Sequence, residues 1–94
     1  RAEAQLAVAE ERWGDAFSYY ESAVEVFSRQ ELCMDWARAL REWAGAHVAR
    51  GEPADYECAK ELYQEALTMF QELGNTYYAN YVEERILRLE RSSA

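Results

Sequence analysis

Residues 13–27 read WGDAFSYYESAVEVF, and residues 56–70 read YECAKELYQEALTMF. A shift of 43 residues (13 to 56) aligns a small, an aromatic and a second small residue: Ala16 with Ala59, Tyr20 with Tyr63, and Ala23 with Ala66. It also aligns the large residues that flank them, Trp13 with Tyr56 and Phe27 with Phe70. Because these positions recur every three or four residues, they share one side of an α-helix. The alternation of alanine with an aromatic ring predicts that a neighbouring helix packs closely against this side in both copies.

A second kind of helical segment precedes each copy. Residues 35–50 have a run of mainly apolar side chains on one side, and residues 2–11 form a shorter, alanine-rich counterpart. The residues on that side of the longer segment are Leu40, Trp43, Ala44 and His47. Gly51 suits the position just past a helix end, and Pro53 suits the first turn of the next helix. Each copy therefore reads as the second helix of a hairpin.

A fifth helix is predicted after the stop signal at Gly74, with Thr76 as its N-cap. No segment shows the strict alternation of a β-strand. The sequence therefore predicts an all-α protein that forms a single domain over residues 1–94. Its parts are a first repeat of about residues 2–29, a second of about 35–73, and a trailing helix of about 76–91.

Composition and charge narrow the classes of function. The 94 residues carry a formal net charge of −8, whereas a surface that binds nucleic-acid phosphates or an anionic membrane is basic. No apolar stretch approaches the ~20 residues that span a bilayer. Cys33 and Cys58 lack the spacing of a metal or redox motif, and unpaired thiols are typical of the reducing cytosol. We therefore expect a cytoplasmic protein without nucleic-acid or membrane partners.

The pattern resembles the tetratricopeptide repeat family over about residues 2–90. In that family, the first helix of each hairpin carries a large residue, a large-small pair and another large residue. The second helix carries an aromatic residue and then small, aromatic and small residues. The matching positions are Leu40, Trp43, Ala44 and His47 for the first helix, and Trp13, Ala16, Tyr20, Ala23, Tyr56, Ala59, Tyr63 and Ala66 for the second. The resemblance implies an α-α superhelix of two hairpins plus a trailing helix, a fold that serves as a scaffold for protein binding.

The repeat period departs from the family pattern. It is 42–43 residues here (36 to 78, 13 to 56), whereas the usual period is ~34 residues. We expect longer connections around residues 28–35 and 52–55 to account for the difference. The long period is similar to repeats of kinesin light chains and of sensory regions in bacterial regulators and nucleotide cyclases. The segments RALREWA (38–44) and ARGEP (49–53) resemble the latter group.

The resemblance also implies a concave groove, lined by the first helix of each hairpin, in which a peptide or a partner helix lies. The residues expected to face it are Gln5 and Val8, then Arg38, Arg41, Gly45 and Val48, and finally Asn80, Glu83 and Leu87. Two interpretations of the arginines stay open. Arg38 and Arg41 could bind a partner's carboxylate through paired hydrogen bonds, or they could bridge neighbouring glutamates of their own chain.

Little in the sequence indicates catalysis, and we expect no catalytic residue, metal ligand or cofactor. His47 is the only histidine, so nucleophilic triads and histidine-rich zinc sites lack parts, and we interpret it as a packing residue. Tyr77, Tyr78 and Tyr81 are interpreted as packing residues too, because base stacking needs a basic groove.

Two alternatives to peptide binding remain. An array of about two and a half repeats leaves an apolar end face, which two copies could bury in a homodimer. The domain would then be a self-association element of a bacterial signalling protein or a cyclase. A more remote alternative is that the chain is part of an enzyme whose active site lies elsewhere.

Overall fold

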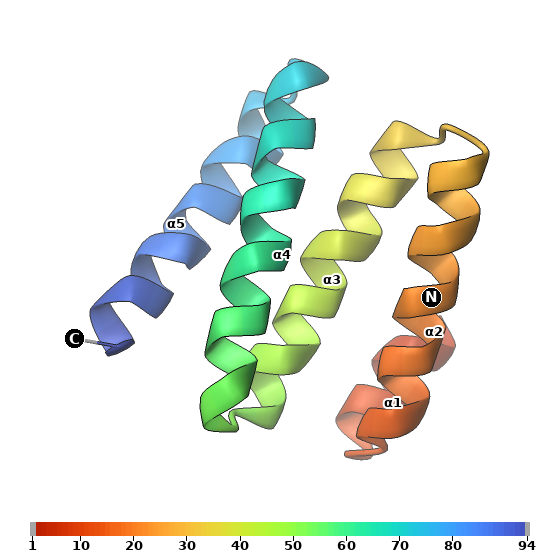
Figure 1. Ribbon diagram of the computed structural model, residues 1–94, viewed down its shortest axis with the longest axis vertical. Coiled ribbons are helices and arrows are strands. Elements are labelled where there is room, and N and C mark those ends of the chain that lie inside the picture. Colours follow the sequence, from red (N-terminus) through yellow and green to blue (C-terminus); the bar gives the residue numbers. More distant parts are fainter. Residues whose placement is uncertain (1, 94) are drawn as a thin grey trace.

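The computed structural model describes residues 2–93, with side chains described for residues 3–91. Its helices are α1 (Ala2–Ala9), α2 (Trp13–Arg29), α3 (Cys33–Arg50), α4 (Pro53–Glu72) and α5 (Thr76–Ser93). No strand occurs in this part of the chain, so the prediction of an all-α fold is confirmed. Each helix packs against the next one along the chain, which makes a series of helical hairpins (Figure 1).

The helices form a flat assembly with principal extents of 32 × 32 × 17 Å. In Figure 1, α2 and α4 lie in front, α1 and α5 lie farther from the viewer, and α3 lies between α2 and α4. The chain reverses its direction at each connection from α2 onward, so α3 and α5 run in the same direction. This arrangement places residues of α3 beside residues of α5, although α4 separates the two helices in the sequence.

The connections between the helices are short. Residues 30–32 join α2 to α3, and residues 51–52 join α3 to α4. The prediction of long connections around 28–35 and 52–55 is therefore wrong. The extra residues of the repeat lie in the helices, since α2, α3 and α4 contain 17, 18 and 20 residues. Pro53 belongs to the first turn of α4, where its missing N–H leaves no helical hydrogen bond unmade.

Three of the four connections close with the same backbone hydrogen bond. A residue in the left-handed conformation stands at each of them, with φ of 60° at Glu11, 56° at Glu31 and 70° at Gly74. The amide of the next residue donates to a carbonyl five positions earlier: Arg12 to Ala7 at 2.7 Å, Leu32 to Phe27 at 3.0 Å, and Asn75 to Phe70 at 2.9 Å. This bond closes helix ends. Glycine adopts the conformation without strain, so the two glutamates gave no stop signal in the sequence.

Side chains cap the starts of α4 and α5. Glu52 and Asp55 form a reciprocal capping box at the start of α4, in which each side chain accepts a hydrogen bond from the other's backbone amide. The Oδ1 atom of Asn75 accepts a hydrogen bond from the amide of Tyr78 at 3.0 Å. Asn75 therefore caps α5, and the prediction that Thr76 is the cap is wrong, because Thr76 is already the first helical residue.

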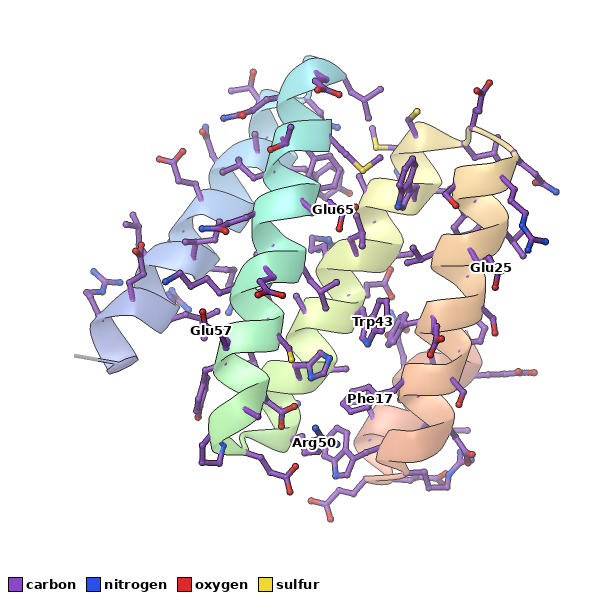
Figure 2. The ribbon with its side chains drawn as sticks, in the orientation of Figure 1. Phe17, Glu25, Trp43, Arg50, Glu57 and Glu65 are labelled. Carbon is purple, nitrogen blue, oxygen red and sulfur yellow. The ribbon has the colours of Figure 1, made fainter. Side chains whose placement is uncertain are left out.

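Two clusters of buried side chains form the core. The larger cluster belongs to α3, α4 and α5, and its largest fully buried apolar residues are Leu40, Phe70 and Val82. The smaller cluster joins α1 and α2 to α3 and consists of Ala4, Ala7, Ala16, Tyr20 and Ala46. The side chain of Phe17 and that of Trp43 also fill the space between α2 and α3 (Figure 2).

The aligned repeat positions differ in how far their side chains are buried. The buried ones are Ala16, Tyr20, Leu40, Ala44, Ala59, Tyr63, Ala66 and Phe70. The half-buried ones are Trp13, Ala23, Phe27 and Trp43. Tyr56 is 39% exposed. The small residues at the centre of the pattern are thus enclosed, whereas several of the large residues lie at the edges of the helix contacts.

Candidate partner-binding surface on helices α3 and α5

Arginine and tyrosine side chains meet where α3 lies beside α5. Arg38 and Arg41 are one helical turn apart on α3, and Tyr78, Tyr81 and Arg85 follow at helical spacing on α5. The Cζ atom of Arg41 lies 5.2 Å from the ring centre of Tyr78 and 5.4 Å from that of Tyr81. Arg38 approaches Tyr78 at 5.9 Å, and Arg85 approaches Tyr81 at 4.8 Å. We call these five residues the arginine–tyrosine surface.

The rings hold the guanidinium groups in place. A cation within ~6 Å of a tyrosine ring centre is attracted by the negative face of the ring, and Arg41 makes two such contacts. Tyr78 in turn stacks on the fully buried Phe70, with ring centres 5.2 Å apart. The guanidinium groups of Arg38 and Arg41 therefore rest against the ring of Tyr78, whose position is fixed by its contact with the core.

The ion pairs among the described residues do not include these three arginines. Elsewhere, four arginines form ion pairs with acidic side chains of the chain itself: Arg12, Arg29, Arg50 and Arg88. Among the residues that the structure describes, Arg38, Arg41 and Arg85 form no such pair within 4.0 Å. In this structure, therefore, neither Arg38 nor Arg41 forms an ion pair with a glutamate among the described residues.

Arg41 also has a polar atom without a partner. Its Nε is buried and makes no hydrogen bond within the described part of the chain. Such atoms are rare, because burying an N–H group without an acceptor costs roughly 1–3 kcal/mol. The indole N–H groups of Trp36 and Trp43 are also buried without a partner in the described residues, so this feature belongs to the packing around α3 and not to the exposed surface.

Tyr63 lies under the same surface. Its side chain comes from α4 and is only 5% exposed. Burial raises the pKa of the Tyr63 phenol, and the nearby positive charges of Arg85 and Arg41 act in the opposite direction. A Cβ at Gly45 would lie 3.8 Å from the Tyr63 hydroxyl, which is an ordinary contact distance. A hollow of about 210 Å³ adjoins this tyrosine, lined by Val48, Tyr56, Tyr63, Arg85, Arg88 and Leu89.

The remaining predicted groove residues fall into two groups. Gln5, Val8 and Gly45 line one hollow of about 250 Å³ between α1, α2 and α3. Asn80 and Glu83 of α5 are exposed, as is Leu87. At 100° per residue, Asn80 is ~200° around the helix from Tyr78, so the structure separates this second group from Arg38 and Arg41. The residues of α5 that do meet the arginines are the tyrosines interpreted above as packing residues.

A second polar cluster joins the end of α3 to the start of α4. Its central residue, Asp55, belongs to the segment 52–55 that was expected to be a connection, but it lies in the first turn of α4. Asp55 is 1% exposed, and its two oxygens accept hydrogen bonds from Arg50 at 2.6 and 2.7 Å and from the Glu52 amide at 3.0 Å. The Nδ1 atom of His47 lies 2.6 Å from Oδ1 of the same carboxylate. The hydrogen bonds from Arg50 hold the pKa of the Asp55 carboxyl well below its usual range. Burial acts in the opposite direction, and the contact with His47 lowers the pKa further.

This cluster also anchors α2. The ring of Phe17 stacks on His47 with centres 4.5 Å apart, and Arg50 lies 4.7 Å from the Phe17 ring centre. Figure 2 shows Phe17 and Arg50 between the lower ends of α2 and α3. The partners of the cluster are all within the chain, so we interpret it as a structural element. A sequence signal was present: Pro53 at the first helical turn places Asp55 at the third helical position, where capping-box carboxylates stand.

Comparisons with family models, curated proteins and solved structures find no match. Within residues 2–93, no three side chains of the metal-binding types are grouped to hold an ion. The same residues include no helix that is long and apolar enough to cross a membrane. The arginine–tyrosine surface is thus the candidate site on which a function can be argued.

Proposed function

We propose that this chain is a protein-interaction module of the tetratricopeptide type, and that its arginine–tyrosine surface binds an acidic segment of a partner protein. The main support for this proposal is that three neighbouring arginines form no ion pair with the described residues, although the chain has 18 acidic residues and a net charge of −8. Of the eight arginines whose side chains the structure describes, four pair with acidic side chains of the chain, and three of the other four gather at this surface. A cluster without such pairs is suited to a carboxylate from another molecule.

The order of the helices supports the family part of the proposal. In a tetratricopeptide array α1, α3 and α5 are the first helices of successive hairpins, and they line the concave side. Arg38 and Arg41 of α3 and Tyr81 and Arg85 of α5 lie on neighbouring helices of that set. A partner segment lying along the surface would meet groups from both helices. Cys33 and Cys58 are exposed and unpaired, which favours a reducing, cytoplasmic location.

The recognition chemistry follows from the guanidinium groups. Arginine donates two parallel hydrogen bonds to a carboxylate, and such charge-assisted bonds contribute ~1.5–3 kcal/mol each. Because the tyrosine rings already restrict Arg38, Arg41 and Arg85, less side-chain entropy is lost on binding. The half-exposed tyrosines add apolar area beside the charges, as in other protein interfaces.

The test is peptide binding measured by fluorescence anisotropy. The probe is a fluorescein-labelled, alanine-based helical peptide with glutamate at every fourth position, and the control peptide has glutamine there. We expect Arg38→Gln with Arg41→Gln to weaken binding at least about tenfold, equivalent to ~1.4 kcal/mol. Arg12→Gln with Arg29→Gln is the matched control, since it removes the same charge from arginines that are paired within the chain. Equal losses in both variants, or no binding by the unmodified chain, would contradict the proposal.

A further inference from the structure

A stripe of carboxylates on α4 is the counterpart of the uncompensated arginines. Glu57, Glu61 and Glu65 are exposed and lie four residues apart, so they follow one side of the helix. That side is opposite to Ala59 and Tyr63, which face the core. In Figure 2, Glu57 lies on the side of α4 toward α5, and Glu65, at the other end of the stripe, lies on the side toward α3. None of the three glutamates forms an ion pair with the described part of the chain.

Both charged regions are internally repulsive. Like charges one helical turn apart destabilise a helix, and this applies to the glutamate stripe. Arg38, Arg41 and Arg85 also bring three positive charges around two adjacent tyrosine rings. A contact between the two regions would relieve both repulsions at once. Within one molecule this contact cannot form, because the stripe lies on the outer side of α4.

The two regions also match in length. The three arginines contact α5 in the order Arg38, Arg41 and Arg85: the first lies over Tyr78, the second over both tyrosine rings, and the third over Tyr81. These contacts extend along α5 from Tyr78 to Arg85. Those seven residue steps of α5 span ~10 Å at the helical rise of ~1.5 Å per residue. The stripe from Glu57 to Glu65 spans ~12 Å by the same rise. A helix that presents this stripe therefore reaches all three guanidinium groups together.

We propose that the occupant of the arginine–tyrosine surface is the glutamate stripe of α4 from a second copy of this chain. The proposal rests on the proposed function, since it names the acidic segment that the surface binds. The two regions lie on different faces, so the contact is head-to-tail: in a pair, one molecule keeps an unused glutamate stripe and the other keeps an unused arginine–tyrosine surface. Such a contact generates open chains of molecules rather than a closed dimer.

The experiment is sedimentation velocity on the whole chain and on charge-reversed variants. At about 0.1 M salt the Debye length is ~10 Å, so repulsion between copies of charge −8 is screened while contact pairs persist. At about 1 M salt, with a Debye length of ~3 Å, the contact pairs are weakened as well. We expect the average mass to rise with protein concentration at the lower salt and to return to the monomer at the higher salt.

Two variants make the contact testable by complementation. Arg38→Glu with Arg41→Glu removes the arginine side but keeps the glutamate stripe. Glu61→Arg with Glu65→Arg removes the stripe but keeps the arginines. We expect each variant alone to be monomeric, because like charges then face each other across the contact. We expect their mixture to associate, because the intact stripe of one variant meets the intact arginines of the other and the two reversed regions again carry opposite charges. The control, Glu21→Arg with Glu83→Arg, changes the net charge as the stripe variant does, at exposed positions outside both regions. It should associate like the unmodified chain.

The outcomes separate this inference from the proposed function. A monomeric unmodified chain at both salt concentrations, or a stripe variant that still associates, overturns the self-association. Binding of the glutamate peptide is measured on the same proteins. If the unmodified chain binds the peptide and the arginine variant does not, the proposed function stands although the second copy is not the occupant. Circular dichroism on every variant confirms that the helices remain folded.

Discussion

Replacing Asp55 with alanine tests whether the polar cluster between α3 and α4 stabilises the fold. The substitution removes the acceptor of two Arg50 bonds, one backbone amide bond and the His47 contact at a position that is 1% exposed. Removing one partner of a buried ion pair costs ~3–5 kcal/mol. We expect the lower end, about 3 kcal/mol, because Arg50 keeps a contact with Glu52 at 3.0 Å.

The expected loss is large for a domain of this size. Each kcal/mol shifts the melting temperature of a 60–100-residue domain by ~4–8 °C, so the Asp55→Ala variant should melt about 12–24 °C lower. Urea unfolding followed by circular dichroism measures the free energy directly. Glu57→Ala is the control, since it removes an exposed, unpaired carboxylate from the same helix and should cost less than ~0.5 kcal/mol. Equal stabilities for the two variants would refute the reasoning.

The dependence on pH gives an independent check. The pKa of Asp55 is lowered in the folded chain, whereas an unfolded aspartate has a pKa of ~3.9. The stabilisation is therefore fully present above the unfolded pKa and is lost as the pH falls toward the folded pKa. The gap in unfolding free energy between the unmodified chain and Asp55→Ala should be constant from about pH 7 to 5 and should shrink below about pH 4. A gap that widens in acid would show that the carboxylate is not the source of the stabilisation.

Two further predictions concern the backbone. Glu31→Gly should raise the unfolding free energy by about 0.5–1 kcal/mol, because the left-handed conformation at φ 56° strains glutamate but not glycine. Gly74→Ala, at φ 70°, should lower the unfolding free energy by ~1–2 kcal/mol for the same reason. If urea unfolding gave changes of the same sign for both variants, this account of the two turns would be contradicted. Gly45→Ala should raise the unfolding free energy by up to ~1 kcal/mol, because alanine favours the helix and its Cβ would lie at an ordinary contact distance of 3.8 Å from the Tyr63 hydroxyl. A lower melting temperature for this variant would mean that the space beside Tyr63 is tighter than this distance implies.

The fold was predictable from the sequence because the repeat marks the buried side of the helices. Ala16 and Ala59 are both fully buried, as the alignment of the two copies indicated. The helix lengths were not predictable in the same way. Glu31, just after α2, adopts a conformation that sequence patterns associate with glycine. Residues 52–55 were expected to lengthen a connection, although Pro53 opens α4 as its residue type indicated.

The candidate site was predicted on one helix and missed on the other. Arg38 and Arg41, two of the expected groove residues, lie at this surface on α3, but their repeat equivalents on α5, Asn80 and Glu83, lie on its far side. Successive helices of a repeat meet through non-equivalent positions, so the partners of α3 are Tyr78 and Tyr81. Finding them requires the orientation of α5 relative to α3, which the alignment of two copies does not contain.

The unequal size of the two core clusters determines how the chain unfolds. Leucine, valine, isoleucine and phenylalanine side chains hold α3, α4 and α5 together, whereas four alanines and one tyrosine form the buried part of the cluster that attaches α1 and α2, with Phe17 and Trp43 partly buried against it. Alanine buries little area, and apolar area sets the free energy of local opening. We therefore expect amide protons of α1 and α2 to exchange with solvent through detachment of this hairpin from α3, at a lower free energy than those of the three-helix unit. The expected order of opening runs from the N-terminal hairpin to the C-terminal helices.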